Sequence, residues 1–268
     1  MDAGNYAALI PMLVRLMASP HYIVHTYAAN AVERMLMVRD RGGIPGQIVK
    51  GRASSTLRFG KERLAPHLQS LLVALFGILE RPGYDHADNE YVMKAVMRVL
   101  GVAAETSAPF IAIALQKLVV VLTRVKGNPA NPTFNHHLFE AIAALVSNVC
   151  KSDASGAVVG QFEEALFPPF NAVLGEQVTE FSPYVFQILA QLLEFNSTHA
   201  ALASKPLSSN YTVLFPLLLN PVNWMNRGDV PALVRLVAAY LIKDGASIAA
   251  KNQLPAVLGV FQKLLSAI

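Results

Sequence analysis

The sequence predicts an all-α solenoid in which antiparallel helix pairs stack on one another in a right-handed superhelix. Three observations support this fold class: apolar residues recur mainly at helical spacing, short polar or proline-containing breaks divide the chain, and the resulting helix pairs repeat. The 268 residues are 53% hydrophobic and 15% charged, a composition that excludes an intrinsically disordered chain. Stacking buries the apolar face of each pair against its neighbours, so no single central core is needed.

The first two helices are expected over Tyr6–Met17 and His21–Val38. In the first, leucines recur at i, i+4 and i+7, while Arg15 lies on another face. Ser19 and Pro20 form the entry signal of the second helix. The apolar stripe of the second helix is expected to consist of Ile23, Tyr27, Ala31 and Met35.

Capping residues and turn clusters divide the rest of the chain. Asp88 and Asn89 provide an N-terminal cap, and Glu90 gives the following helix an acidic first turn. Residues 127–132 form a turn cluster rich in asparagine and proline. The expected elements are helices over Asn89–Glu105, Thr106–Lys126, Thr133–Cys150, Val158–Leu174, Thr179–Glu194, Asp229–Ile242 and Gln253–Ser266, with a shorter apolar segment over Tyr211–Leu219.

The helix pairs recur at a nearly constant interval. The second members start near His21, Asn89, Thr133, Glu180 and Asp229, at intervals of 68, 44, 47 and 49 residues. Helix pairs with a period of about 40–47 residues are the signature of HEAT or armadillo arrays. Removing the 22 residues 39–60 shortens the first interval to 46. We therefore expect about five and a half repeats over residues 1–268, with a basic, glycine-rich loop inserted at 39–60.

The charge balance points to the same loop. The formal net charge is +4, but residues 39–63 carry +5 and the rest of the chain carries −1. A nearly neutral body with one basic insertion does not indicate direct binding to nucleic acid. The longest uncharged run, 206–226, contains three prolines, and the apolar segment Leu64–Leu79 has only 16 residues, so no membrane insertion is expected.

The motifs of catalysis and metal binding are missing from the sequence. His21 and His25 are spaced for one helix face, but no zincin glutamate or third ligand accompanies them. The glycines near Lys61 do not have phosphate-loop spacing. The single cysteine, Cys150, ends an apolar run and is expected to be a buried structural thiol. We expect a protein that is not an enzyme and has no catalytic, cofactor or metal site, although scattered catalytic residues would escape such a search.

A few polar residues on the second helices are candidates for partner binding. Lys94 and Arg98 lie four residues apart on one helix face, and Arg235 stands alone in an apolar run. Second helices usually line the concave surface of a solenoid, where partners bind. An acidic protein partner is one reading of these residues, and a solvated helix face is the other. Asn135 and His136, near the start of the next second helix, complete the candidate set.

Seven stretches carry a resemblance to a known family. They are His25–Arg34, Asn89–Arg98, Phe134–Ile142, Phe162–Phe167, Thr179–Ile188, Pro231–Leu236 and Leu254–Lys263. In this order they resemble the middle-to-later repeats of the cellular apoptosis susceptibility family, importin-β-like karyopherins that export importin-α. The resemblance implies a HEAT-repeat receptor that binds importin-α together with Ran-GTP, passes nuclear pore proteins and shuttles between nucleus and cytoplasm.

The resemblance also sets the limits of what this chain is expected to do. Family members are several times longer, so we expect a fragment of a longer array that by itself binds Ran or importin-α weakly. The loop at 39–60 matches the family poorly. The alternative function is a HEAT scaffold that organises other proteins without a transport role. We further expect Arg98→Glu to weaken partner binding in the full-length parent while leaving thermal stability unchanged.

Overall fold

The computed structural model describes residues 3–40, 56–83 and 88–266, and its regular elements in these ranges are helices. No strand occurs in the described ranges, where one isolated antiparallel bridge joins Arg39 to Leu57. The all-α prediction is therefore confirmed. The chain divides into two compact units, Met1–Val149 and Cys150–Ile268, which are described separately.

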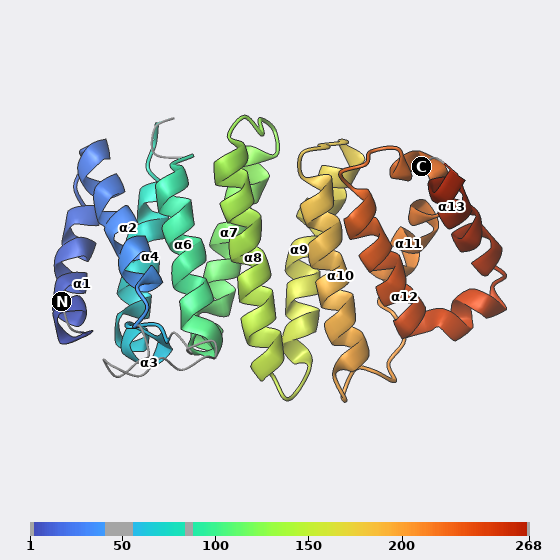
Figure 1. Cartoon of the computed structure of the whole chain (residues 1–268), viewed down its shortest axis with the longest axis horizontal. Helices are drawn as coiled ribbons and strands as arrows, with labels where there is room; N and C mark the ends of the chain where they lie inside the picture. Colours follow the sequence, from blue (N-terminus) through green and yellow to red (C-terminus); the bar gives the residue numbers. More distant parts are fainter. Residues whose placement is uncertain (1–2, 41–55, 84–87, 267–268) are drawn as a thin grey trace, which may run out of the picture. The chain divides into compact units, whose positions relative to one another are not determined.

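The first unit consists of paired helices (Figure 1). Its described elements are α1 (Ala3–Met17), α2 (Tyr22–Met37), α3 (Lys61–Leu64), the 3-10 helix η1 (Ala65–His67), α4 (Leu68–Leu79), α6 (Glu90–Ala103), the 3-10 helix η2 (Ala104–Phe110), α7 (Ile111–Val125) and α8 (Pro132–Ser152), which runs to the unit boundary.

Helices of the first unit pack both within a pair and between pairs. The second helix α2 contacts α1 of its own pair and α6 of the next pair. Helix α4 is the first helix of its pair. It contacts its partner α6, and it also contacts α1 and α7, the first helices of the neighbouring pairs. Helices α2 and α4 thus each pack against their partner helix and against the equivalent helix of a neighbouring pair. This is how repeats too small to fold alone build a continuous core.

Two arginines make the same contact in successive pairs of the first unit. Arg81, just after α4, donates from Nη2 to the Met17 carbonyl (2.7 Å) and from Nη1 to the Ser19 carbonyl (2.6 Å) at the end of α1. Arg124, in the last turn of α7, donates from Nη1 to the Leu79 carbonyl at the end of α4 (2.9 Å). Each guanidinium satisfies carbonyls left open at the C-terminus of the preceding first helix. The two arginines stand 43 residues apart in the sequence, close to the repeat period.

The second unit continues the alternation of first and second helices. Its described elements are α9 (Ala157–Gly175), α10 (Ser182–Thr198), α11 (Ser209–Leu218), the 3-10 helix η3 (Pro221–Trp224), α12 (Val230–Ala250) and α13 (Leu254–Ser266). The second helices α10 and α12 pack along each other. Asp244 has non-helical backbone angles (φ −137°, ψ 24°), so α12 bends there, two residues beyond the expected end at Ile242.

A ladder of aromatic rings joins the helices of the second unit. Tyr211 of α11 lies edge-on to Phe167 of α9 and to Tyr240 of α12, with ring centroids 4.8 and 5.7 Å apart. The Tyr211 hydroxyl donates to the Leu189 carbonyl of α10 (2.9 Å), and the Tyr240 hydroxyl donates to the Tyr211 carbonyl (2.8 Å). All three rings are buried. The ladder therefore fixes four helices through edge-to-face contacts and satisfied hydroxyls.

The expected apolar stripe of α2 is wrong over its first half. Ile23 and Tyr27 are 67% and 70% exposed. The buried face of α2 instead includes the polar residues His25, Thr26 and Glu33. Buried polar groups carry no hydropathy signal, so the apolar pattern alone selected a stripe rotated away from the packed face.

Most of the loop expected at 39–60 lies outside the described residues. At its described edges, Asp40 accepts a hydrogen bond from Arg58 Nε (2.7 Å), and the Arg58 amide donates to the Val38 carbonyl (2.9 Å). The chain therefore returns close to the end of α2 before α3 begins. The repeat count and the insertion remain predictions.

One described stretch, Glu90–Val125, is long and apolar enough to cross a membrane by length and composition alone. It is not one continuous α-helix, because η2 separates α6 from α7 and Ala104 has a φ of 50°. Each helix buries an apolar stripe within the first unit. The stripe of α6 includes Val96, and the stripe of α7 includes Leu118. The apolar character of this stretch is thus accounted for by packing between repeats.

Replacing Gly156 with alanine is expected to destabilise the second unit by about 2–4 kcal/mol. Gly156 precedes α9 with a φ of +73°, and an added Cβ would lie 2.8 Å from Leu202 Cγ and 3.0 Å from His199 Nδ1. Gly160→Ala is the matched control, because Gly160 lies inside the same helix with nothing within 4 Å of an added Cβ. That variant is expected to gain about 0.5–1 kcal/mol. Urea unfolding of both variants measures the difference, and equal stabilities would contradict the assigned strain.

Candidate partner-binding site

Three helices of the first unit bring together a group of polar side chains that we call the polar cluster: Glu33 of α2, Lys94 and Arg98 of α6, and His136 and His137 of α8. It contains three of the five candidate residues from the sequence. Lys94 and Arg98 are half-buried and His136 is exposed. The adjacent rings of His136 and His137 have centroids 5.5 Å apart.

An ion pair lies at the base of the polar cluster. Arg98 Nη2 lies 3.5 Å from Glu33 Oε1, and the Glu33 side chain is fully buried. The pairing is incomplete, since Glu33 Oε2 and Arg98 Nε are buried without a hydrogen-bond partner among the described residues. The exposed Arg34 guanidinium lies 3.8 Å from Glu33 Oε2 and offsets part of its charge. A buried carboxylate depends strongly on such cations, because few other groups replace its hydration.

His137 is held neutral by its surroundings. Burial, together with the neighbouring His136, Lys94 and Arg98, lowers the pKa of His137 to about 4. Its Nδ1 atom is buried without a hydrogen-bond partner among the described residues. Within the described part of the chain, three buried polar atoms of the cluster therefore lack a hydrogen-bond partner: one carboxylate oxygen, one guanidinium nitrogen and one imidazole nitrogen.

Lys94 is the cation of the cluster best placed to meet a partner. No hydrogen bond or ion pair is described between Lys94 and another residue in the ranges that the structure covers. Its charge is therefore not neutralised by Glu33, whose described cationic contacts are Arg98 and Arg34. A half-buried ammonium group beside a second cation favours a carboxylate from a partner.

The other two candidate residues lie elsewhere. Asn135 is 4% exposed, and its Nδ2 donates to the Pro129 carbonyl (3.2 Å), so it braces the turn before α8. Arg235 belongs to the second unit, where its Nε and Nη2 donate to the two carboxylate oxygens of Glu194, each at 2.7 Å. This bidentate pair links α12 to α10 and neutralises Arg235. Neither residue joins the polar cluster.

His25, from the histidine pair rejected as a metal site, and Cys150, the predicted structural thiol, are both buried. His25 is fully buried, with Nδ1 3.2 Å from the Ser19 carbonyl and 3.1 Å from Arg81 Nη1. The described residues contain no group of three or more His, Cys, Asp or Glu side chains that could hold a metal ion. Cys150 is buried, as predicted, and burial chiefly raises the pKa of its thiol to about 12.

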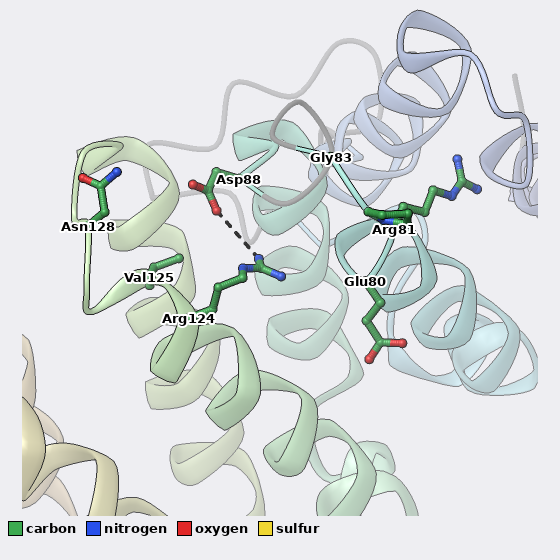
Figure 2. Close-up of a pocket in the computed structure, with 8 residues that line it drawn as sticks. Glu80, Arg81, Gly83, Asp88, Arg124, Val125 and Asn128 are labelled. Carbon is green, nitrogen blue, oxygen red and sulfur yellow. Dashed lines mark ion pairs between the residues drawn. The ribbon is translucent and has the colours of Figure 1, made fainter.

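A cavity of about 440 Å³ opens between the ends of α4 and α7. Figure 2 shows Arg124 paired with Asp88 across it (3.7 Å), while the Arg81 side chain extends away from that pair. Both arginines are already bound to helix C-terminal carbonyls. The charged residues of this cavity are therefore engaged in joining successive pairs.

The second unit also contains a buried polar group, which the sequence did not predict. Glu163 of α9 is buried and accepts a hydrogen bond from Asn196 Nδ2 (2.8 Å). Burial raises the pKa of Glu163 despite that bond. Lys243 donates to the carbonyls of Asn196 (3.1 Å) and Leu202 (2.6 Å). These contacts hold the segment after α10 against α12 and are structural.

His137→Gln is expected to remove a pH dependence of stability. The pKa of His137 is about 4 in the folded chain, against about 6.5 for an unperturbed histidine. The unfolded chain therefore binds the proton more readily, and stability is lost as the pH falls from about 6.5 towards 4. Solvent screening of this partly exposed group limits the loss to about 1 kcal/mol.

Urea unfolding at several pH values in this window measures the loss of stability, with His136→Gln as the exposed control. A wild-type slope in His137→Gln would contradict the assignment.

A family model for the C-terminus of the CAS/CSE protein matches residues 48–268. The chain is 40% identical over 261 residues to exportin-2 of Drosophila melanogaster, and 41% identical over 260 residues to exportin-2 of Homo sapiens. These matches cover 97% and 96% of the chain, but 25% and 24% of the relatives. The chain thus spans about a quarter of the length of the curated relatives that it matches.

A solved structure shares the fold. The exportin Cse1 in its cargo-free, cytoplasmic state is similar over 99% of this chain and 25% of that chain, with a TM-score of 0.76 and 26% identity. The match confirms the HEAT-repeat solenoid as the fold class. The relatives are exportins, which are transport receptors and not enzymes.

Proposed function

The chain belongs to the CAS/CSE protein family, and from this premise we propose that it is a segment of a nuclear export receptor. The receptor binds importin-α together with Ran-GTP and returns importin-α to the cytoplasm. It shuttles between the two compartments and passes nuclear pore proteins on the way. The observation that carries the proposal is the similarity to exportin-2 over 96% or more of the chain. Because the chain spans a quarter of these relatives, the activity is proposed for the whole receptor.

The polar cluster suits the binding part of this function. A receptor of this kind performs no bond chemistry, so its mechanism consists of contacts that differ between loaded and empty states. Among the described residues Lys94 has no hydrogen-bond or ion-pair partner, and Arg98 Nε is buried without a hydrogen bond. An acidic side chain of importin-α or Ran would pair with the Lys94 ammonium group, whereas the buried Nε of Arg98 lies out of its reach. Contacts of this type set specificity and association rate more than total affinity.

The function is tested on the full-length receptor by pull-down with purified importin-α and Ran. We expect tight capture of importin-α only when Ran carries GTP. Capture that is equally tight with Ran-GDP or without Ran would reject the export mechanism. It would favour instead the alternative of a HEAT scaffold without a transport role.

Lys94→Glu tests the part played by the polar cluster. In the full-length receptor this change is expected to weaken the complex with importin-α and Ran-GTP about tenfold, because it replaces attraction to a carboxylate by repulsion. Arg15→Glu is the matched control, since Arg15 is exposed on α1 in the same unit and outside the cluster. Surface plasmon resonance measures both affinities, and unfolding by urea verifies that both variants remain folded. Equal affinities for the two variants would remove Lys94 from the interface.

A further inference from the structure

A groove of about 800 Å³ runs between the two helix pairs of the second unit. Its walls come from the end of α9 and the start of α10 on one side, and from α11, η3 and the turn before α12 on the other. This volume is in the range of sites that enclose drug-sized ligands, about 300–1,000 Å³. The groove belongs to the second unit, whereas the polar cluster belongs to the first, so the inference drawn from the groove does not rest on the polar cluster.

Neutral amide side chains give the groove its polar character. Asn171 of α9, Gln177 of the following turn and Asn210 of α11 line it. No hydrogen bond is described between these three side chains and other residues in the covered ranges. Each amide offers both a donor and an acceptor. That is the combination needed to pair with the alternating N–H and C=O groups of an extended polypeptide backbone.

Apolar side chains continue the groove onto the surface. Val213, Leu217 and Val222 line it and are 70%, 58% and 65% exposed. Met225 follows in the next turn and is 78% exposed. Exposed apolar residues that gather beside a groove mark an interaction site. Because Met225 lies outside the groove lining, exposed apolar surface continues beyond the groove, which favours a polypeptide segment over a small molecule as the occupant.

One carboxylate in the groove favours an occupant with a positive charge. Asp229, at the start of α12, lines the groove and is 6% exposed. Its Oδ2 accepts from Asn226 Nδ2 (3.1 Å), but its Oδ1 has no hydrogen-bond partner among the described residues. Burial raises the pKa of Asp229, although the hydrogen bond from Asn226 acts in the opposite direction. A cationic donor from an occupant would compensate the charge of this carboxylate.

We propose that this groove binds an extended polypeptide segment of a partner in which apolar and basic side chains alternate. The amides hold the backbone, the lip of Val213, Leu217 and Val222 takes an apolar side chain, and a lysine or arginine reaches Asp229. The segment is recognised by this chemistry and not by a folded surface.

The test uses the 268-residue chain and three dye-labelled synthetic peptides that alternate leucine with lysine, leucine with glutamate, or serine with lysine. Fluorescence anisotropy is expected to show saturable binding of the leucine–lysine peptide, about tenfold tighter than either of the other two. Absence of saturable binding would overturn the proposal. Equal binding of the serine–lysine peptide would also overturn it, because charge alone would then explain the affinity.

Variants assign the peptide to the groove. Leu217→Asn is expected to weaken binding about tenfold, whereas Leu258→Asn, which changes an equally exposed leucine on α13 outside the groove, leaves it unchanged. Asp229→Asn is expected to bring the two leucine peptides to equal affinity. Lys94→Glu leaves peptide binding intact, so this test does not depend on the export function. Unchanged binding in Leu217→Asn, or a retained lysine preference in Asp229→Asn, would contradict the assignment.

Discussion

Replacing Tyr211 with alanine is expected to lower the free energy of unfolding of the second unit by about 3–5 kcal/mol. The side chain is fully buried and contacts rings from α9 and α12, while its hydroxyl donates to α10. Truncation removes the apolar area, both edge-to-face contacts and one hydrogen bond, and it leaves a cavity among α9, α10, α11 and α12. A solenoid transmits stability only through contacts between neighbouring pairs, so the loss cannot be shared across the chain.

Two further tyrosine variants separate the terms of this prediction. Tyr211→Phe keeps the ring and loses only the hydroxyl bond to Leu189, so about 1 kcal/mol is expected. Tyr22→Ala is the surface control, because Tyr22 of α2 is 41% exposed, and it is expected to cost less than about 1 kcal/mol. Urea unfolding measures the three values, and hydrogen exchange locates the loss in the second unit. A cost below 1 kcal/mol for Tyr211→Ala would show that the ladder does not join the helices.

The elements that the sequence predicts well are those with strong boundary signals. Asn89 was expected to cap a helix, and its side chain accepts from the Val92 amide (3.2 Å) at the start of α6. The apolar runs after Pro132 and before Gly175 likewise became α8 and α9 within a few residues of expectation. Local capping and helical periodicity are encoded within one turn of the chain, so a single sequence is enough to read them.

The face that each helix buries was harder to predict, and this limited the site. Glu33 lies on the packed side of α2 with His25 and Thr26, where apolar periodicity gives no sign of burial. Arg81 and Arg124 act on helix ends more than 40 residues away in sequence. Such long-range polar contacts depend on the stacking of pairs, and no local pattern reports them. Their spacing at nearly one repeat was a signal that could have identified them.

Arg98→Glu is expected to destabilise the first unit by about 3–5 kcal/mol, because it leaves the buried Glu33 carboxylate facing a second carboxylate. This revises the expectation, drawn from sequence, that stability would not change. Arg98 lies 3.5 Å from Glu33, and the remaining cation near that carboxylate, Arg34, is exposed at 3.8 Å. A loss of partner binding in this variant would therefore mix unfolding with the loss of a contact, which is why Lys94 is the better probe of the interface.

A double-mutant cycle isolates the energetic coupling between Glu33 and Arg98. Glu33→Gln removes the buried charge and leaves Arg98 partly in solvent, so its own cost is expected to be about 1 kcal/mol. In the double variant Glu33→Gln/Arg98→Glu the like-charge contact is gone, and most of the loss caused by Arg98→Glu should be recovered. Urea unfolding of the four proteins gives the coupling. Additive effects would mean that Arg98 and Glu33 do not interact energetically. The ion pair assigned to the polar cluster would then not contribute to stability.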